Sequence, residues 1–367
     1  MKPLAPLGTD FAALIAAVRP AIEERLAALW DERLVALRRH GAEVTAMASA
    51  ARDLTLRGGK RYRAALLAAA YAGAAPGASL EPALQAGVAL ELLQTYLLIQ
   101  DDWMDGDLTR RGGPTVHAAL AERLGGAHLG AASAMLASDL SWNLAVSVVS
   151  AIDLPPSRVL ATLRELVRVH EDVIVGQQID MLGRAEDVEA MHALKTGSYT
   201  VRGPLALGAT LAGAAAEAGA ALDRFAAPLG VAFQLRDDLL GTFGATAETG
   251  KPVGNDLRAG KRTAVLAEAM DGGASLDAGQ RAEVERAFGR ASATDAEVAA
   301  AAAALEACGA RAAVTERLAQ LCREAEAIAR GLPLAPPAPA LLAGAAAALA
   351  PGGSLRESVR PSAVVVP

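Results

Sequence analysis

The sequence predicts an all-α protein that folds as one helical bundle. Helix-favouring alanine, leucine, arginine and glutamate are abundant, while aromatic residues make up only 3% of the 367 residues. Apolar residues recur at helical spacing, and no strong strand-like alternation is found. Two aspartate clusters about 135 residues apart each end a long apolar stretch. No linker rich in serine, glycine or proline separates two apolar blocks, so we expect a single domain.

The first half of the chain is predicted to start with an amphipathic helix over 9–40. A second helical segment ends at Gly58-Gly59, and Lys60-Arg61-Tyr62-Arg63 opens the next helix. The helix dipole opposes basic side chains at a helix start unless an anion binds there, so this placement indicates phosphate. A long helix over 81–105 ends in the first aspartate cluster.

The remaining chain is predicted to be helical as well, with a domain over 1–350 and a disordered tail over 351–367. Ala-Pro repeats at 335–339 interrupt the pattern before a last short helix. The predicted helices cover 128–151, 157–182, 218–241, 261–271, 277–291, 296–308, 310–330 and 339–350.

Composition excludes several classes of protein. The net charge of −6 argues against a nucleic-acid binder. Cys308 and Cys322 have no other metal-ligating residues at suitable spacing, and they are expected to be reduced thiols. The longest apolar run, 131–152, contains Asp139 and Asn143, so it is interpreted as a bundle helix and not as a membrane span. No signal peptide opens the sequence, and we expect a cytoplasmic protein without stable membrane insertion.

The first aspartate cluster has the spacing of a metal site. Asp101 and Asp105 are four residues apart and share one face of a helix, with Asp102 beside them. Mg²⁺ prefers a few carboxylates together with phosphate and water. A solvated acidic helix end is the alternative, but the helix dipole disfavours acidic groups at that end.

The second cluster is weaker when taken alone. Asp237 and Asp238 lie near the end of an apolar helix, but Gly241 stands where a carboxylate four residues later would be. Gln234 adds a polar group one turn before the pair. Together, the two clusters predict a diphosphate clamped by Mg²⁺ inside a helical bundle.

Basic residues beside glycines supply the anion contacts that such a site needs. Glycine allows the backbone to approach an anion closely, although each basic residue alone is more typical of a solvated surface. The candidates are Lys60, Arg63, Arg110, Arg111, Lys195, Lys251 and Lys261.

In order along 50–265, six motifs resemble those of the trans-isoprenyl diphosphate synthases, or polyprenyl synthetase family. Closest in pattern are the geranylgeranyl diphosphate synthases. The motifs are Gly58-Gly59-Lys60-Arg61-Tyr62-Arg63, Asp101 to Asp105 with Arg110-Arg111, Gly176-Gln177-Gln178-Ile179-Asp180, Lys195-Thr196, Phe233 to Asp238, and the two lysines Lys251 and Lys261.

The resemblance implies a helical bundle around a deep central cavity, usually dimeric, that condenses isopentenyl diphosphate with an allylic prenyl diphosphate. Three Mg²⁺ ions would be held by the two aspartate clusters: Asp101, Asp102, Asp105, Asp237 and Asp238. The allylic diphosphate would be bound by Arg110, Lys195, Lys251 and Lys261, and isopentenyl diphosphate by Lys60, Arg63, Gln94 and Arg111. Thr196 and Gln234 would turn oxygens toward the allylic cation.

Three positions depart from the family pattern. Gln94 stands where many members have histidine, Gly241 replaces the third aspartate of the second motif, and Ala64 replaces proline. A glutamine amide still donates a hydrogen bond but carries no charge.

Product length is predicted from the helix below the first cluster. Tyr96 lies five residues before Asp101, about 7.5 Å along a helix, and in the family an aromatic residue there is typical of geranylgeranyl (C20) synthases. Leu97 follows it and the motif has no insertion, which makes farnesyl (C15) the second choice and leaves longer products open. Leu93, one turn further down, is a second candidate floor of the cavity.

Two other classes stay open. A class I terpene cyclase would need an Asn/Asp…Ser/Thr…Glu metal motif, which 237–244 lacks. A non-catalytic partner subunit would be expected to lose an aspartate motif or the lysines, and only Gly241 favours it.

Overall fold

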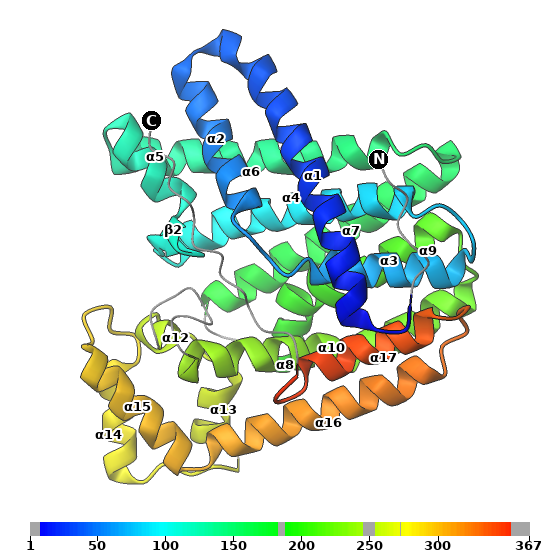
Figure 1. The fold of residues 1–367 in the computed structure, drawn as a ribbon. Coiled ribbons are helices and arrows are strands. Elements are labelled where there is room, and N and C mark those ends of the chain that lie inside the picture. The colour runs from blue at the N-terminus through cyan, green and yellow to red at the C-terminus, as the bar shows by residue number, and fades with distance from the viewer. Residues whose placement is uncertain (1–7, 183–187, 245–253, 272, 354–367) are drawn as a thin grey trace.

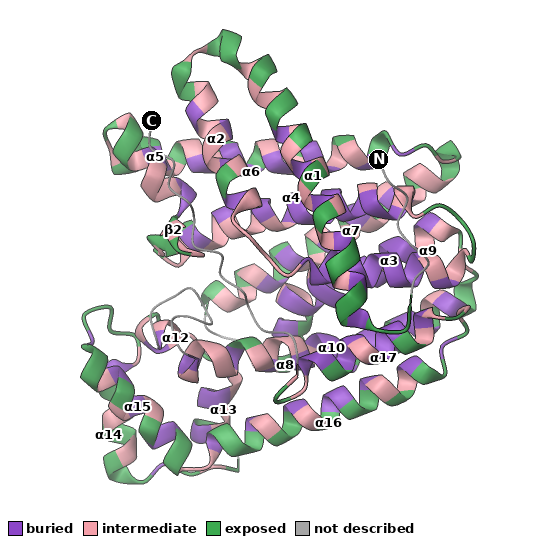
Figure 2. Ribbon diagram, viewed as in Figure 1, coloured by how far each residue is buried: buried purple, intermediate pink, exposed green. Residues whose placement is uncertain are grey.

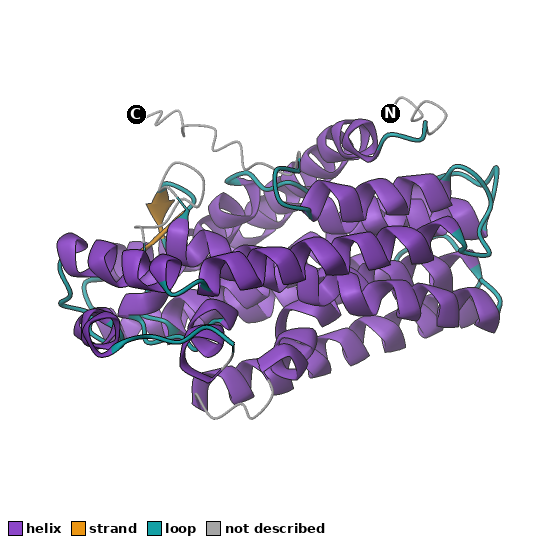
Figure 3. Cartoon of the chain, turned by 90° about the horizontal axis from the view of Figure 1, so that it is seen from below, coloured by secondary structure: helices purple, strands orange, loops and turns teal. Residues whose placement is uncertain are grey.

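The computed structural model is a bundle of helices and confirms the predicted fold class (Figure 1). It describes residues 8–182, 188–244, 254–271 and 273–353. Lys251 and most of the predicted disordered tail lie outside these ranges. The long helices run roughly side by side along the molecule when it is seen from below (Figure 3).

The N-terminal half contains one helical hairpin, two central helices and two long covering helices. A short hairpin of two-residue strands follows the first aspartate cluster. The elements are α1 (Phe11–Leu37), η1 (Arg38–His40), α2 (Ala42–Leu56), α3 (Tyr62–Ala74), α4 (Glu81–Met104), β1 (Thr109–Arg110), β2 (Gly113–Pro114), α5 (Val116–Leu124), α6 (Ala127–Ser150) and α7 (Pro156–Leu182).

The C-terminal half carries the second aspartate cluster and ends in helices α14 to α17, of which α17 packs against α16, α3 and α1. The elements are α8 (Val188–His192), the π-helix η2 (Ala193–Arg202), α9 (Gly203–Ala212), α10 (Ala216–Phe243), α12 (Asn255–Arg258), α13 (Ala264–Asp271), α14 (Ala278–Ala287), α15 (Asp295–Ala307), α16 (Ala310–Arg330) and α17 (Ala338–Leu349).

Most predicted helices are confirmed within a few residues, but the sequence pattern did not predict α5 or any helix over 188–212. The segment 193–213 is rich in glycine and contains Pro204, which usually marks a loop. Here Pro204 lies in the first turn of α9, directly where the π-helix η2 continues into it. A Cβ on Gly208 would lie 2.5 Å from the carbonyl oxygen of Leu67, so this glycine allows α9 to contact α3.

The core lies between the central helices. Residues 64–70 of α3 are all buried, and α4 packs between α3 and α6 (Figure 2). The outer helix α16 buries one stripe against α10 and exposes the other face. Within this arrangement α4, α7, η2 and α10 all contribute residues to one cavity, so they position the candidate site.

Two of the helices in the described part of the chain are long and apolar enough to cross a membrane, judged by length and composition only. In α4, 72% of the apolar window is buried inside the protein, whereas in α6 the share is 39%. The helices α15 and α16, bent by 64° at their junction, pass the same test as a pair.

Candidate active site

A cavity of about 410 Å³ opens between α3, α4, α7, η2 and α10. Charged groups gather near the ends of α4 and α10, and apolar residues of α4 and α7 line other parts of the wall. Residues from all of the predicted motifs in the described ranges contribute to it. Its lining includes Lys60, Arg63, Gln94, Leu97, Leu98, Asp101, Arg110, Arg111, Val173, Ile174, Lys195, Thr196, Gln234, Asp237 and Lys261.

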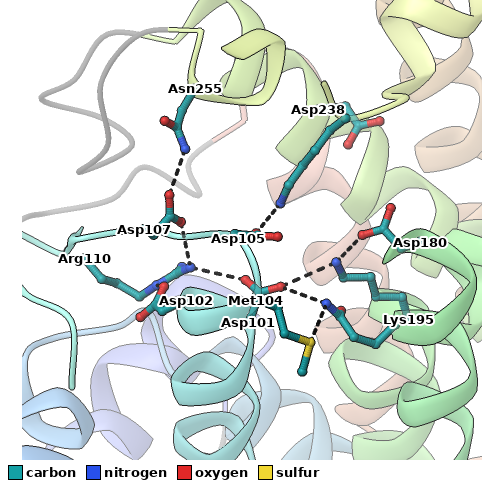
Figure 4. Close-up of polar contacts among 12 residues, drawn as sticks. Asp101, Asp102, Met104, Asp105, Asp107, Arg110, Asp180, Lys195, Asp238 and Asn255 are labelled. Atoms are coloured by element: carbon teal, nitrogen blue, oxygen red, sulfur yellow. Dashed lines mark hydrogen bonds and ion pairs between the residues drawn. The ribbon is translucent and has the colours of Figure 1, made fainter. Parts of the chain in front are cut away.

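Asp101 lies at the centre of the first site, on the last turn of α4 (Figure 4). Its carboxylate is 3.3 Å from an Nη of Arg110 and 3.5 Å from Nζ of Lys195. The amide of Gln177 donates to it at 3.5 Å. Three elements therefore converge on this side chain: the β1–β2 hairpin, η2 and α7.

Asp105 lies one turn further along and pairs with Lys261 at 2.5 Å. Burial and the charge of Asp101 raise the pKa of Asp105, and Lys261 partly offsets them. Burial alone would lower the pKa of Lys261, but Asp101 and Asp105 outweigh it and raise the pKa. The lysine is therefore firmly cationic beside the first cluster.

Asp102 has different surroundings from its two neighbours. It is fully buried, pairs with the Nε of Arg110, and is not among the described residues that line the cavity. Burial lowers the pKa of Arg110, but Asp102 and Asp101 together outweigh it. The structure therefore gives Asp102 the role of holding Arg110, and its predicted contact with a cation stays a prediction.

The two aspartates of the second cluster also differ in their surroundings. Asp237 lines the cavity, whereas Asp238 is only 3% exposed. Asp238 accepts the backbone N–H of Ala264 at 2.7 Å and the amide of Gln234 at 2.6 Å. Burial raises its pKa to about 7 despite these bonds. Asp238 thus joins α10 to the start of α13, and Asp237 is the carboxylate that faces the cavity.

Two arginines at turns near the residues predicted for isopentenyl diphosphate have an unusual backbone conformation. Arg111 has a φ of 51° in the β1–β2 turn and donates to the carbonyl of Gly58 at 2.9 Å. Arg61 has a φ of 54° at the start of α3 and forms a buried ion pair with Glu91 of α4. Non-glycine residues rarely adopt this conformation, and such strain clusters at functional sites.

Arg63 is a cation that the protein holds against the cavity wall. It donates to the hydroxyl of Thr200 at 2.8 Å, and its guanidinium lies 4.4 Å from the ring centre of Tyr199. Lys60 and Gln94 line the cavity beside it. The four residues predicted for this subsite are therefore brought together.

The π-helix positions the pair Lys195-Thr196. Lys195 bonds Asp180 of α7 at 2.5 Å, and Thr196 lines the cavity. A Cβ on Gly176 would lie 2.3 Å from the backbone nitrogen of Lys195, so only glycine allows α7 this close. The roles of Gln177 and Asp180 did not follow from the residues alone, although both belong to the Gly176 to Asp180 motif.

The predicted chain-length residues are buried and do not line the cavity in the described ranges. Tyr96 is 8% exposed, and its ring centre is 4.8 Å from that of His170 and 6.3 Å from that of Trp142. Leu93 is fully buried. Neither belongs to the described residues that line the cavity, where Leu97 and Leu98 represent α4.

The donor set fits Mg²⁺ in its usual protein mode. Within the described ranges, no three acidic, histidine or cysteine side chains already form a metal cluster. Mg²⁺ commonly takes one or two carboxylates and completes its shell with phosphate and water. Asp101 and Asp105 on one side and Asp237 on the other, with lysines beside them, match that requirement.

Comparison with known proteins agrees with this geometry. The polyprenyl synthetase family model matches residues 44–305. The chain is 34% identical over 267 residues to geranylgeranyl diphosphate synthase of Methanosarcina mazei, covering 71% of this chain and 76% of that protein. It is 38% identical over 221 residues to farnesyl diphosphate synthase of Geobacillus stearothermophilus, covering 56% and 69%.

Solved structures give the same result over almost the whole chain. A geranylgeranyl pyrophosphate synthase from Corynebacterium glutamicum, complexed with isoprenyl diphosphate and magnesium, aligns with a TM-score of 0.82 at 29% identity, covering 94% of this chain and 99% of that one. A Caulobacter crescentus polyprenyl synthase, complexed with calcium and isoprenyl diphosphate, aligns with a TM-score of 0.73 at 25% identity, covering 93% and 98%. The chain therefore belongs to the polyprenyl synthetase family and is a prenyltransferase that makes isoprenyl diphosphates.

Proposed function

We propose that this prenyltransferase uses Mg²⁺ to condense isopentenyl diphosphate with an allylic diphosphate and releases mainly geranylgeranyl diphosphate, with farnesyl diphosphate as the second candidate. The observation that carries the proposal is the division of charge in one cavity. Asp101 and Asp237 line it with Lys195 and Lys261, and Asp105 pairs with Lys261 beside it. Lys60, Arg63 and Arg111 line the same cavity as a second cationic group. One group suits a diphosphate with metal ions, and the other suits a diphosphate bound by cations alone.

Three carboxylates would hold the Mg²⁺ ions: Asp101, Asp105 and Asp237. When bound, the metal acts as a Lewis acid that neutralises charge on the leaving diphosphate. Lys195 lies against Asp101 and Lys261 against Asp105, which supports a role for both lysines in binding diphosphate oxygens. Arg110 is held by Asp102 and extends this cationic side of the cavity.

The reaction then needs only positioning and charge stabilisation from the protein. The allylic C–O bond breaks, the diphosphate leaves with the electron pair, and the double bond of isopentenyl diphosphate forms the new C–C bond. A proton lost from the adjacent carbon goes to the released diphosphate. Thr196 and Gln234 line the cavity, where their oxygens can stabilise the allylic cation.

Product length is proposed to depend on a cluster of aromatic rings next to the α4 residues that line the cavity. Tyr96, Trp142 and His170 come from α4, α6 and α7 and pack together. Leu97 and Leu98 line the cavity above them. A tail that grows past these leucines would meet the ring cluster, which supports the C20 assignment over a longer product.

A product assay tests the proposal. Purified protein is incubated with labelled isopentenyl diphosphate and, separately, dimethylallyl, geranyl or farnesyl diphosphate, and dephosphorylated products are separated by chromatography. We expect C20 from all three primers. Dominant C15 from the two shorter primers, with no use of farnesyl diphosphate, would move the assignment to a farnesyl synthase.

Metal dependence is tested in the same assay. EDTA should abolish product formation, and added Mg²⁺ should restore it. Full activity in metal-free buffer would contradict the proposed chemistry.

We further propose that the protein works as a homodimer in the cytoplasm. Apolar side chains that are about half exposed gather on α6 and α7, including Leu129, Leu136, Val167 and Val175. An apolar face of this kind is typical of a protein interface. Light scattering at micromolar concentration should give twice the monomer mass of 37.3 kDa.

A further inference from the structure

The second aspartate cluster lacks a carboxylate that the first one has. Asp101 and Asp105 share a helix face, but the residue four positions after Asp237 is Gly241. On α10 a side chain at 241 would extend from the same face as Asp237. The second site is therefore short of one oxygen donor if α10 is its only source.

The structure shows that the space beside Gly241 is already filled. A Cβ built on Gly241 would lie 1.9 Å from Oδ2 of Asp256 and 2.9 Å from its Cγ. No side chain at 241 fits while Asp256 keeps this position. The carboxylate of Asp256, on the short helix α12, thus lies where the first atoms of a residue 241 side chain would be.

Asp256 also acts electrostatically on the site. It lines a small cavity of about 90 Å³ with Asp237, Asp238 and Lys261. Burial is the main reason that the pKa of Asp238 is raised, and the charge of Asp256 adds to it. Burial would lower the pKa of Lys261, but Asp101, Asp105 and Asp256 raise it.

Contacts on both sides hold α12 in this place. Asn255 donates to Asp107, next to the first cluster, at 3.0 Å. On the other side Arg258 donates to the carbonyl of Ala293 at 3.0 Å and pairs with Asp295. The position of Asp256 between the two aspartate clusters is therefore fixed by its neighbours in sequence.

We propose that Asp256 supplies the second cation site with the carboxylate that Gly241 lacks. The site is then built from two elements, with Asp237 on α10 and Asp256 on α12, and glycine at 241 is what makes room for the replacement. The inference rests on the proposed Mg²⁺-dependent function. The ligand is a hard divalent cation that also binds diphosphate.

The test counts bound Mn²⁺ by electron paramagnetic resonance, with a geranyl diphosphate analogue whose bridging oxygen is sulfur and which does not ionise. Asp256→Asn should weaken the last Mn²⁺ to bind by about 10–100-fold. Gly241→Ala should do the same, because its methyl group displaces Asp256. The double variant Gly241→Asp/Asp256→Ala should recover most of the loss, since it clears the space beside 241 and returns the carboxylate from α10.

Asp295→Asn is the matched control, because it removes a fully exposed carboxylate near α12 whose ion pair contributes little, and it leaves Asp256 and the other α12 contacts in place. Its Mn²⁺ binding should stay at the wild-type level. Wild-type binding in Asp256→Asn, or an equal loss in Asp295→Asn, would overturn the inference while leaving the proposed function intact. Wild-type protein that binds no Mn²⁺ with the analogue would overturn both.

Discussion

At the residue scale, neighbouring aspartates have separate tasks. Asp101 and Asp237 face the cavity, whereas Asp102 and Asp238 are buried and hold other groups. Asp102 pairs with Arg110, and Asp238 accepts the N–H that begins α13. The pair Asp-Asp therefore combines one cavity-facing carboxylate with one structural carboxylate in both clusters.

This difference between the aspartates predicts which of two substitutions lowers kcat more. Asp101→Ala should lower kcat more than Asp238→Ala, because Asp101 lies among the cavity cations and Asp238 does not line the main cavity. The Asp101 carboxylate is proposed to bind a cation that neutralises the charge developing on the leaving diphosphate. Its loss should raise the activation free energy by about 3–4 kcal/mol, which lowers the rate roughly 10²–10³-fold. Steady-state kinetics with matched circular dichroism spectra measures both variants.

Stability should rank the two variants in the opposite order. Asp238→Ala leaves the N–H of Ala264 without its acceptor, which should cost about 1–3 kcal/mol in the free energy of unfolding. Asp238→Asn keeps an acceptor oxygen and is the matched control.

An Asp238→Ala protein with lower kcat than Asp101→Ala would show that the ranking of the two sites is wrong.

His192 should make the protein less stable in mild acid. Burial lowers the pKa of His192 to about 4, and the nearby charge of Asp180 only partly offsets this. Unfolded, the group has a pKa of 6.5. Between these values the unfolded chain binds a proton that the folded protein does not. The stability that neutral His192 contributes is therefore complete above pH 6.5 and is lost as pH falls toward 4.

Urea unfolding of wild type and His192→Gln at pH 7.5 and pH 5 measures this effect. The wild type should lose about 2 kcal/mol more than the variant over this interval. His128→Gln, at an exposed position, is the control and should follow the wild type. Parallel pH dependence of wild type and His192→Gln would contradict the prediction.

At the element scale, the close contact between α7 and the π-helix decides where Lys195 lies. Gly176→Ala would place a methyl group 2.3 Å from the nitrogen of Lys195 and 2.7 Å from its Cα, so one backbone must move. We expect the free energy of unfolding to fall by about 1–3 kcal/mol. A 1 Å displacement of Lys195 should lower kcat by about 10²-fold.

Gly219→Ala is the matched control for this variant. Gly219 lies inside α10, and nothing would be within 4 Å of its Cβ. Alanine there should raise stability by about 0.5–1 kcal/mol and leave kcat unchanged. A Gly176→Ala enzyme with wild-type kcat would show that the contact does not position Lys195.

The same elements show what the sequence could and could not predict. Helices α4 and α10 followed from their apolar patterns. The first aspartate cluster followed from its i,i+4 spacing, whereas the second was weaker alone because Gly241 stands four residues after Asp237. The π-helix did not follow, because glycines and Pro204 resemble a loop until the packing against α7 and α3 is known. Asp256 was missed for a related reason: its carboxylate replaces a side chain on another helix, and no spacing along the chain records that.

On the scale of the whole molecule, the cavity changes from charged to apolar. Lysines, arginines and aspartates lie at the ends of α4 and α10, while Leu97, Leu98, Val173 and Ile174 line the wall elsewhere. In the proposed function, diphosphates would be held among the charged groups, and a growing prenyl tail would extend along the apolar wall. Burial of the tail stabilises each added unit by about 25 cal/mol per Å².

Tyr96→Ala should lengthen the product from C20 toward C25 or beyond. The Tyr96 ring packs on Trp142 and His170, and it directly precedes the cavity-lining Leu97 and Leu98. We expect its removal to open space for a further unit. Because no contact with diphosphate or metal changes, the KM for the allylic substrate should stay within a few-fold.

Product chromatography on Tyr96→Ala measures the change, with Tyr71→Ala as the control. Tyr71 is also buried, at 4% exposure against 8% for Tyr96, but it lies on α3, whereas Tyr96 directly precedes the cavity-lining Leu97 and Leu98 on α4. Both variants should lose stability, by about 3–5 kcal/mol, but only Tyr96→Ala should change the product. An unchanged product distribution in an active Tyr96→Ala enzyme would place the floor of the cavity elsewhere, with the fully buried Leu93 as the next residue to substitute.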